Sequence, residues 1–128
     1  RLGAAIAAID AAQSRLDGDP ADIAGRMIDV ANGLYAHVNG PDGVDAMEYQ
    51  HAFGAALAAR EALTRNEAAL RARNAAVYDE ALGEVNRLVA LFPTPTAPER
   101  PATLQQVSAQ SSRAKLALGS LKGAPAPR

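Results

Sequence analysis

The sequence predicts an all-α protein, a bundle of four or five helices, and three observations lead to this fold class. Alanine occurs in nearly every turn, and alanine has the highest helix propensity of all residues. Large apolar residues recur at spacings of three, four and seven positions, as they do along one face of a helix. Between Asp45 and Phe92 the chain contains no proline, and its only glycines there are Gly54 and Gly83. A length of 128 residues fits a single domain.

Two helices are expected before residue 40. The first covers residues 2–16. Its large apolar side chains share one stripe: Leu2, Ile6, Ile9 and Leu16. The second starts at Asp19 and Pro20, because aspartate caps helices well and proline suits the first helical position. Its expected stripe is Ile23, Met27, Val30 or Ala31, Leu34 and Val38. Residues 39–41, Asn-Gly-Pro, end it, since glycine can take the left-handed cap and proline cannot continue a helix.

The long stretch from Asp45 to Phe92 is the central element of the chain. As one continuous helix it would be roughly 70 Å long at about 1.5 Å per residue, far longer than the two preceding helices could cover. Thr64 opens a second, weaker capping box, and Asn66 and Asn74 are poor interior helix residues. We therefore expect a kink or break between about Thr64 and Asn74. A single long helix projecting from the bundle is the alternative.

A proline-rich segment separates this stretch from the last helix. Residues 93–101 contain four prolines, a composition that favours polyproline II and predicts a semi-rigid spacer. The last helix, within residues 102–123, opens with a capping box at Thr103 and should pack on the bundle core of residues 1–92. Residues 124–128 are expected to form a disordered tail.

Charge is distributed unevenly, although the formal net charge is only −1. Residues 1–50 contain eight acids and three arginines, whereas residues 101–128 contain four basic residues and no acid. We therefore expect the last helix to dock on the acidic N-terminal helices, with a charged pole that faces a partner as the alternative. A nearly neutral total gives no general attraction to nucleic acid, so nucleic-acid binding is not expected.

Several classes of chemistry find no support in the sequence. The chain has no cysteine, which excludes disulfides, thiol chemistry and cysteine metal sites but leaves the compartment open. It has no glycine-rich phosphate loop, no Ser/His/Asp grouping and no segment long and apolar enough to span a membrane. We therefore expect no enzyme activity and no cofactor. Peripheral membrane contact through the basic last helix is a weaker alternative.

One metal-like grouping occurs, formed by His37, Glu48 and His51. Glu48 and His51 are three positions apart on one helix face, the Glu-x-x-His spacing of di-iron bundles. With only two histidines in the chain a complete di-iron site is excluded, and a mononuclear zinc site is the version left open. The simpler interpretation is that Glu48 forms a capping box with Asp45 and that both histidines lie at the surface.

A second motif lies in the spacer. Pro95, Pro98 and Arg100 match P-x-x-P-x-R, in which two prolines of a polyproline II ridge enter aromatic grooves and the arginine meets an acidic pocket. Because the pattern is common, we expect the segment to serve chiefly as a spacer.

The expected function is a non-enzymatic protein interaction or assembly module that binds a protein partner or associates with itself. Alanine buries little area per residue, so a partner could complete part of the apolar surface. The expected contact residues are Leu70, Val77, Tyr78, Leu82 and Val85. The alternative is an extracytoplasmic ligand- or metal-sensing bundle that uses the corner of His37, Glu48 and His51.

Overall fold

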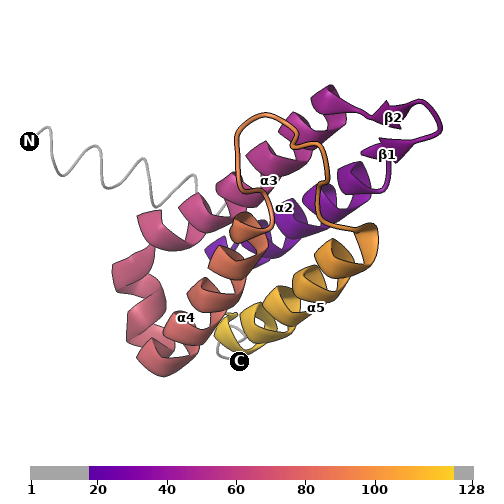
Figure 1. Ribbon diagram of the computed structural model, residues 1–128. Helices are drawn as coiled ribbons and strands as arrows, with labels where there is room; N and C mark the ends of the chain where they lie inside the picture. Colours follow the sequence, from indigo (N-terminus) through magenta and orange to yellow (C-terminus); the bar gives the residue numbers. More distant parts are fainter. Residues whose placement is uncertain (1–17, 123–128) are drawn as a thin grey trace, which may run out of the picture.

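The computed structural model describes residues 18–122, so the helix expected over residues 2–16 and the tail of residues 124–128 lie outside the described residues. Within the described range the all-α prediction is confirmed (Figure 1). The elements are α2 (Pro20–Tyr35), β1 (Asn39–Gly40), β2 (Gly43–Val44), α3 (Ala46–Arg65), α4 (Glu67–Ala90) and α5 (Leu104–Leu121).

These helices form an antiparallel bundle in which α2 lies between α3 and α5, and α4 packs on α3 and α5. Two ion pairs give the direction of α5. Lys115 pairs with Asp29 of α2 at 2.7 Å, and Lys122, further along α5, pairs with Asp22 at 3.1 Å. Because the order of the partners is reversed, α5 runs opposite to α2. The expected docking of the basic last helix on an acidic helix is confirmed for the described part.

The start of α2 follows the predicted cap. The carboxylate of Asp19 accepts a hydrogen bond from the Ala21 amide at 3.1 Å, and Pro20 occupies the first helical position. Asp22 lies in the first turn, where the helix dipole favours negative charge.

The buried face of α2 differs in part from the predicted stripe, of which only Ala31 and Val38 are fully buried. It consists of Pro20, Ala21, Ala24, Ile28, Ala31 and Tyr35. The larger residues Ile23, Met27 and Leu34 are only half-buried, and Val30 is 44% exposed. Small alanine side chains on α2 and α3 let the two helices approach closely, so the bulky residues stand at the edge of the contact.

A short hairpin joins α2 to α3. The strands pair antiparallel, with Asn39 opposite Val44 and Gly40 opposite Gly43. Gly43 has φ +112°, a conformation that glycine adopts without strain. The Asp45 carboxylate then caps α3 by accepting a hydrogen bond from the Glu48 amide at 3.0 Å. The sequence predicted the Asp45 cap, but the expected end of the helix at residues 39–41 with a left-handed Gly40 was wrong. α2 ends at Tyr35, Gly40 lies in β1, and only Gly43 of this turn has a positive φ. The second half of the capping box is not formed, because the Asp45 amide donates to the Val38 carbonyl and not to Glu48.

The central stretch is broken, as expected, and in two places. α3 ends at Arg65, and the side-chain amide of Asn66 donates to the Ala62 carbonyl at 2.7 Å. The second interruption is at Asn74, whose φ of −170° and ψ of 105° are extended, and its side-chain oxygen accepts from the Val77 amide at 3.0 Å. Each asparagine thus satisfies a backbone group that an interrupted helix leaves free.

The proline-rich segment arches over one end of the bundle instead of forming a straight polyproline II ridge (Figure 1). Two bends interrupt it. The Tyr49 hydroxyl donates to the Thr94 carbonyl at 2.8 Å, and the Tyr35 hydroxyl donates to the Ala102 carbonyl at 2.6 Å. The segment does separate α4 from α5, but it is pinned to the bundle rather than extended away from it.

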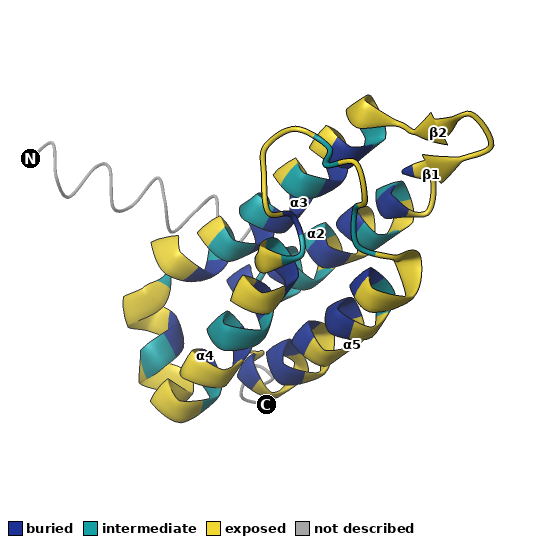
Figure 2. Ribbon diagram, in the orientation of Figure 1, coloured by how far each residue is buried: buried dark blue, intermediate teal, exposed yellow. Residues whose placement is uncertain are grey.

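The buried residues face the interior of the bundle along every described helix (Figure 2). Alanine supplies many of them, and the larger ones include Ile28, Leu63, Leu88, Leu118 and all three tyrosines. None of the described helices combines the length and the hydrophobicity that crossing a membrane requires.

Candidate functional site

The residues predicted to contact a partner lie mostly in the core of this chain. Leu70, Tyr78 and Val85 are 0% exposed, and Val77 and Leu82 are half-buried against the same core. The apolar stripe of α4 closes the bundle, so in the folded domain no partner can reach its three buried members. A core stripe and an interface stripe have the same 3.6-residue period, and the sequence alone cannot separate them.

The three residues of the metal-like grouping are not gathered into a site. Among residues 18–122 no group of three His, Cys, Asp or Glu side chains could hold a metal ion. His37 and His51 are exposed, and Glu48 lies in the first turn of α3 with its amide on the Asp45 cap. The Glu48 carboxylate has one buried oxygen without a hydrogen-bond partner, at a helix end whose dipole favours negative charge.

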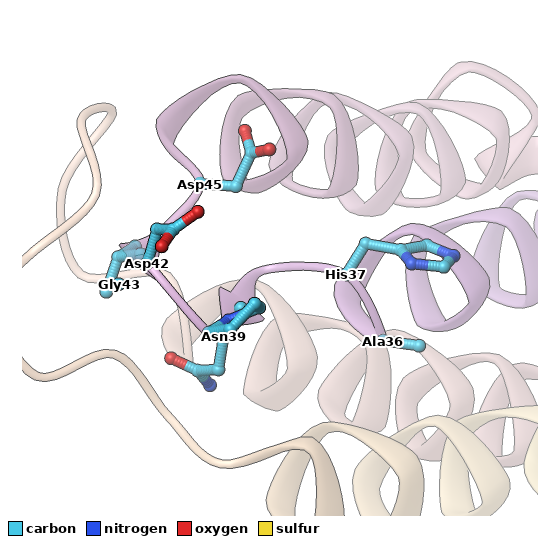
Figure 3. A pocket seen from close by; sticks show the side chains of 9 residues that line it. Ala36, His37, Asn39, Asp42, Gly43 and Asp45 are labelled. Carbon is cyan, nitrogen blue, oxygen red and sulfur yellow. The ribbon is translucent and has the colours of Figure 1, made fainter.

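The hairpin between α2 and α3 lines an open hollow of about 510 Å³ (Figure 3). Its lining residues are Ala36, His37, Asn39, Gly40, Pro41, Asp42, Gly43, Val44 and Asp45. Small-molecule sites are usually concave and lined by large apolar groups, whereas this lining has little apolar surface besides Val44 and Pro41. The lining is therefore unlike that of a typical small-molecule pocket.

Two apolar side chains are exposed near this turn. Val44 of β2, which lines the hollow, is 36% exposed, and Met47, in the first turn of α3, is 65% exposed. Together with Asp42 and Asp45 they form what we call the hairpin face. Neither residue belongs to the buried stripe of α3, which begins at Tyr49. That mismatch is the sequence signal that could have identified the hairpin face.

The hairpin face is also acidic. In the sequence no lysine or arginine occurs between Arg26 and Arg60, whereas Asp42, Asp45 and Glu48 all lie at this turn. The face therefore combines exposed apolar groups with negative charge that has no lysine or arginine in its own segment, although His37 lines the same hollow.

Leu116, at the middle of α5, is the most exposed large apolar residue of the described part, at 80%. Arg113 lies one turn before it and donates to the Gln110 side chain at 3.5 Å. A single exposed leucine is common on protein surfaces and needs no functional explanation.

At the other end of the bundle Arg73 joins three helices. Its guanidinium pairs with the Asp19 carboxylate at 2.5 Å and donates to the Leu121 carbonyl at 3.2 Å. Burial alone would raise the pKa of Asp19, but the hydrogen bond and charge of Arg73, together with the amides of Ala21 and Asp22, lower it overall. Since Asp19 caps α2 and Leu121 ends α5, this cluster stabilises helix ends.

Comparison with known proteins found no family model, no curated protein and no solved structure that matches this chain. The candidate sites therefore come from the structure of this chain alone. They are the hairpin face and the proline-rich segment that Tyr35 and Tyr49 hold.

Proposed function

We propose that this chain is a non-enzymatic helical interaction module that binds a protein partner through its hairpin face. The observation that carries the proposal is the 65% exposure of Met47 in the first turn of α3, three positions after the exposed Val44 of the hairpin. Methionine is flexible and polarizable, and it is common on surfaces that bind other proteins. Exposed apolar groups rimmed by polar ones are typical of such surfaces.

The fold supports this role by holding the hairpin in place. The Asp45 amide donates to the Val38 carbonyl at 2.7 Å, and Val38 is itself 0% exposed. The cap on the Glu48 amide fixes the first turn of α3, on which Met47 lies. A surface that is already ordered loses less conformational entropy when it binds, which favours affinity.

Charge indicates the chemistry of the partner. A partner surface that places an apolar side chain against Met47 and a lysine or arginine near Asp42 would complement the hairpin face in both respects. Charge pairs of this kind chiefly raise the association rate and set specificity, and salt weakens them.

Site-directed photo-crosslinking tests the proposal. A photoreactive residue at position 47 of the full chain, expressed in its own cells, should give one discrete crosslinked protein species. A matched residue at position 112, exposed on α5, should not give that species. Asp42→Lys should reduce the yield from position 47. A species of twice the chain mass would identify a second copy as the partner. The same products from positions 47 and 112, or none from either, would overturn the proposal.

A further inference from the structure

Four of the five aromatic side chains of this protein meet at one end of the bundle. We call this cluster the aromatic corner: Tyr35, Tyr49, Phe53 and Phe92. Phe92 lies at its centre, with ring centroids 5.4 Å from Tyr35, 5.3 Å from Tyr49 and 5.3 Å from Phe53. Tyr35 comes from α2, Tyr49 and Phe53 come from α3, and Phe92 lies two residues after the end of α4.

Residues 93–102, which we call the strap, lie against this corner. The two tyrosine hydroxyls reach the strap near its two ends, at the carbonyls of Thr94 and Ala102. Ala97, between these two hydrogen bonds, and Ala102, at the second of them, pack on the core, and Pro98 is half-buried. Among the described residues no backbone–backbone hydrogen bond joins the strap to a helix. The hydroxyls are therefore its principal polar attachment.

This arrangement has the chemistry of proline-rich peptide recognition. Proline has no N–H to donate, so a proline-rich segment is held through its carbonyl oxygens and through packing against aromatic rings. In the aromatic corner, the hydroxyls of Tyr35 and Tyr49 donate to strap carbonyls, and Ala97 and Ala102 of the strap pack against the hydrophobic core that contains these two rings. The segment that contains Pro95, Pro98 and Arg100, predicted as a spacer or as an SH3-type ligand, is thus attached to the bundle of its own chain by two tyrosines.

We propose that the aromatic corner is a binding site for a bent, proline-containing segment of a partner protein, which the strap occupies until that segment displaces it. The inference does not depend on the hairpin face. The strap itself indicates which kind of segment would bind. Such a segment needs two carbonyl oxygens, one near each end, to accept from the hydroxyls of Tyr35 and Tyr49, and it needs no free backbone amide between them.

The strap is suited to displacement. Pro95 and Arg100 are exposed, and the described residues offer Arg100 no carboxylate within ion-pair distance. Its bends depart from the straight conformation that its prolines favour. A segment with few buried contacts opens at low free energy compared with global unfolding. Because both its ends are tethered, the strap nevertheless competes at a high effective concentration and closes the site when no partner is present.

A linker variant with a free site provides the test. Residues 94–101 of the full chain are replaced by a glycine–serine stretch of equal length, and a peptide with the sequence of residues 93–102 is titrated into it. Removing the tethered competitor should let the peptide bind at least about tenfold more tightly than it binds the unaltered chain. Within the linker variant, Tyr49→Phe should weaken binding roughly three- to tenfold, as expected for one lost hydrogen bond.

A control peptide with glycine in place of its prolines should bind markedly less well. Equal affinity of the two peptides, or no gain on the linker variant while its helix content and mass stay unchanged, would overturn the proposal.

A second measurement on the unaltered strap keeps the idea testable if the linker variant does not fold. Replacing Tyr35 and Tyr49 together with phenylalanine should lower the NMR backbone order parameters of Thr96 and Ala97 while that of Ala114 in α5 is unchanged. Unchanged order parameters in the strap would show that the hydroxyls do not hold it, and would contradict the proposed displacement.

Discussion

Replacing Ser111 with alanine is expected to stabilise this protein. Ser111 lies on the inner face of α5, is 3% exposed, and its buried hydroxyl oxygen has no hydrogen-bond partner. An unsatisfied buried hydroxyl costs about 1–3 kcal/mol of desolvation free energy, which alanine does not incur. Alanine also has the higher helix propensity, by roughly 0.5 kcal/mol. We therefore expect Ser111→Ala to raise the free energy of unfolding by about 1.5–3.5 kcal/mol.

Urea unfolding followed by circular dichroism measures this change, and the neighbouring Ser112 provides a matched control. Ser112 is exposed on the same helix, so Ser112→Ala should gain only the propensity difference, about 0.5 kcal/mol or less. The difference between the two variants isolates the effect of burial. If Ser111→Ala gains no more than Ser112→Ala, or destabilises the protein, the hydroxyl has a partner or a role that the burial argument omits.

Three further predictions concern the core, a helix break and pH. Val85→Asp should unfold the chain, because a buried unpaired carboxylate costs more than about 3 kcal/mol, whereas Leu82→Asp at a half-buried position should cost less; thermal melts separate the two. Asn74→Ala should lower stability by about 1 kcal/mol in denaturant unfolding, since it removes the side-chain cap on the Val77 amide. Burial raises the pKa of Asp19, but the hydrogen bond and charge of Arg73 together with the amides of Ala21 and Asp22 lower it overall, so the folded pKa lies below the ordinary value of 3.8. Its contribution to stability is present above that value and is lost as pH falls through the lowered folded pKa. Arg73→Met should therefore reduce the loss of unfolding free energy that the protein shows as the pH falls below about 4. An unchanged loss at acid pH would show that the Arg73–Asp19 ion pair does not contribute to this pH dependence.

The parts of the fold that the sequence predicted depend on local interactions. The cap of α2, the Asp45 cap of α3 and the break near Asn66 each involve residues within four positions of one another. Such signals are visible in a short window of sequence, because the backbone groups that a helix end leaves free must be satisfied nearby.

What the sequence could not show depends on contacts between distant residues. The residues Ile23, Met27 and Leu34 were chosen by size, but close packing placed Ala21, Ala24 and Ile28 inside instead. The stripe of α4 was assigned to a partner because periodicity does not distinguish a chain's own core from an interface.

The strap shows the same limit. Tyr35 and Ala102 are 67 positions apart, and nothing local indicates that this hydroxyl would pin the proline-rich segment. The hairpin face, by contrast, left a local sign, since Val44 and Met47 are apolar residues outside the buried stripe of α3.

The central claim, that the hairpin face carries the function, is tested most directly by titrating the protein crosslinked from position 47 against the unaltered chain and against Met47→Ser. Burying a methionine side chain is worth about 1.5–3 kcal/mol, so the account predicts at least about a tenfold loss of affinity. The melting temperature should hardly change, because the side chain is 65% exposed, and Leu116→Ser should bind as the unaltered chain does. Equal affinity of Met47→Ser and the unaltered chain would contradict the claim.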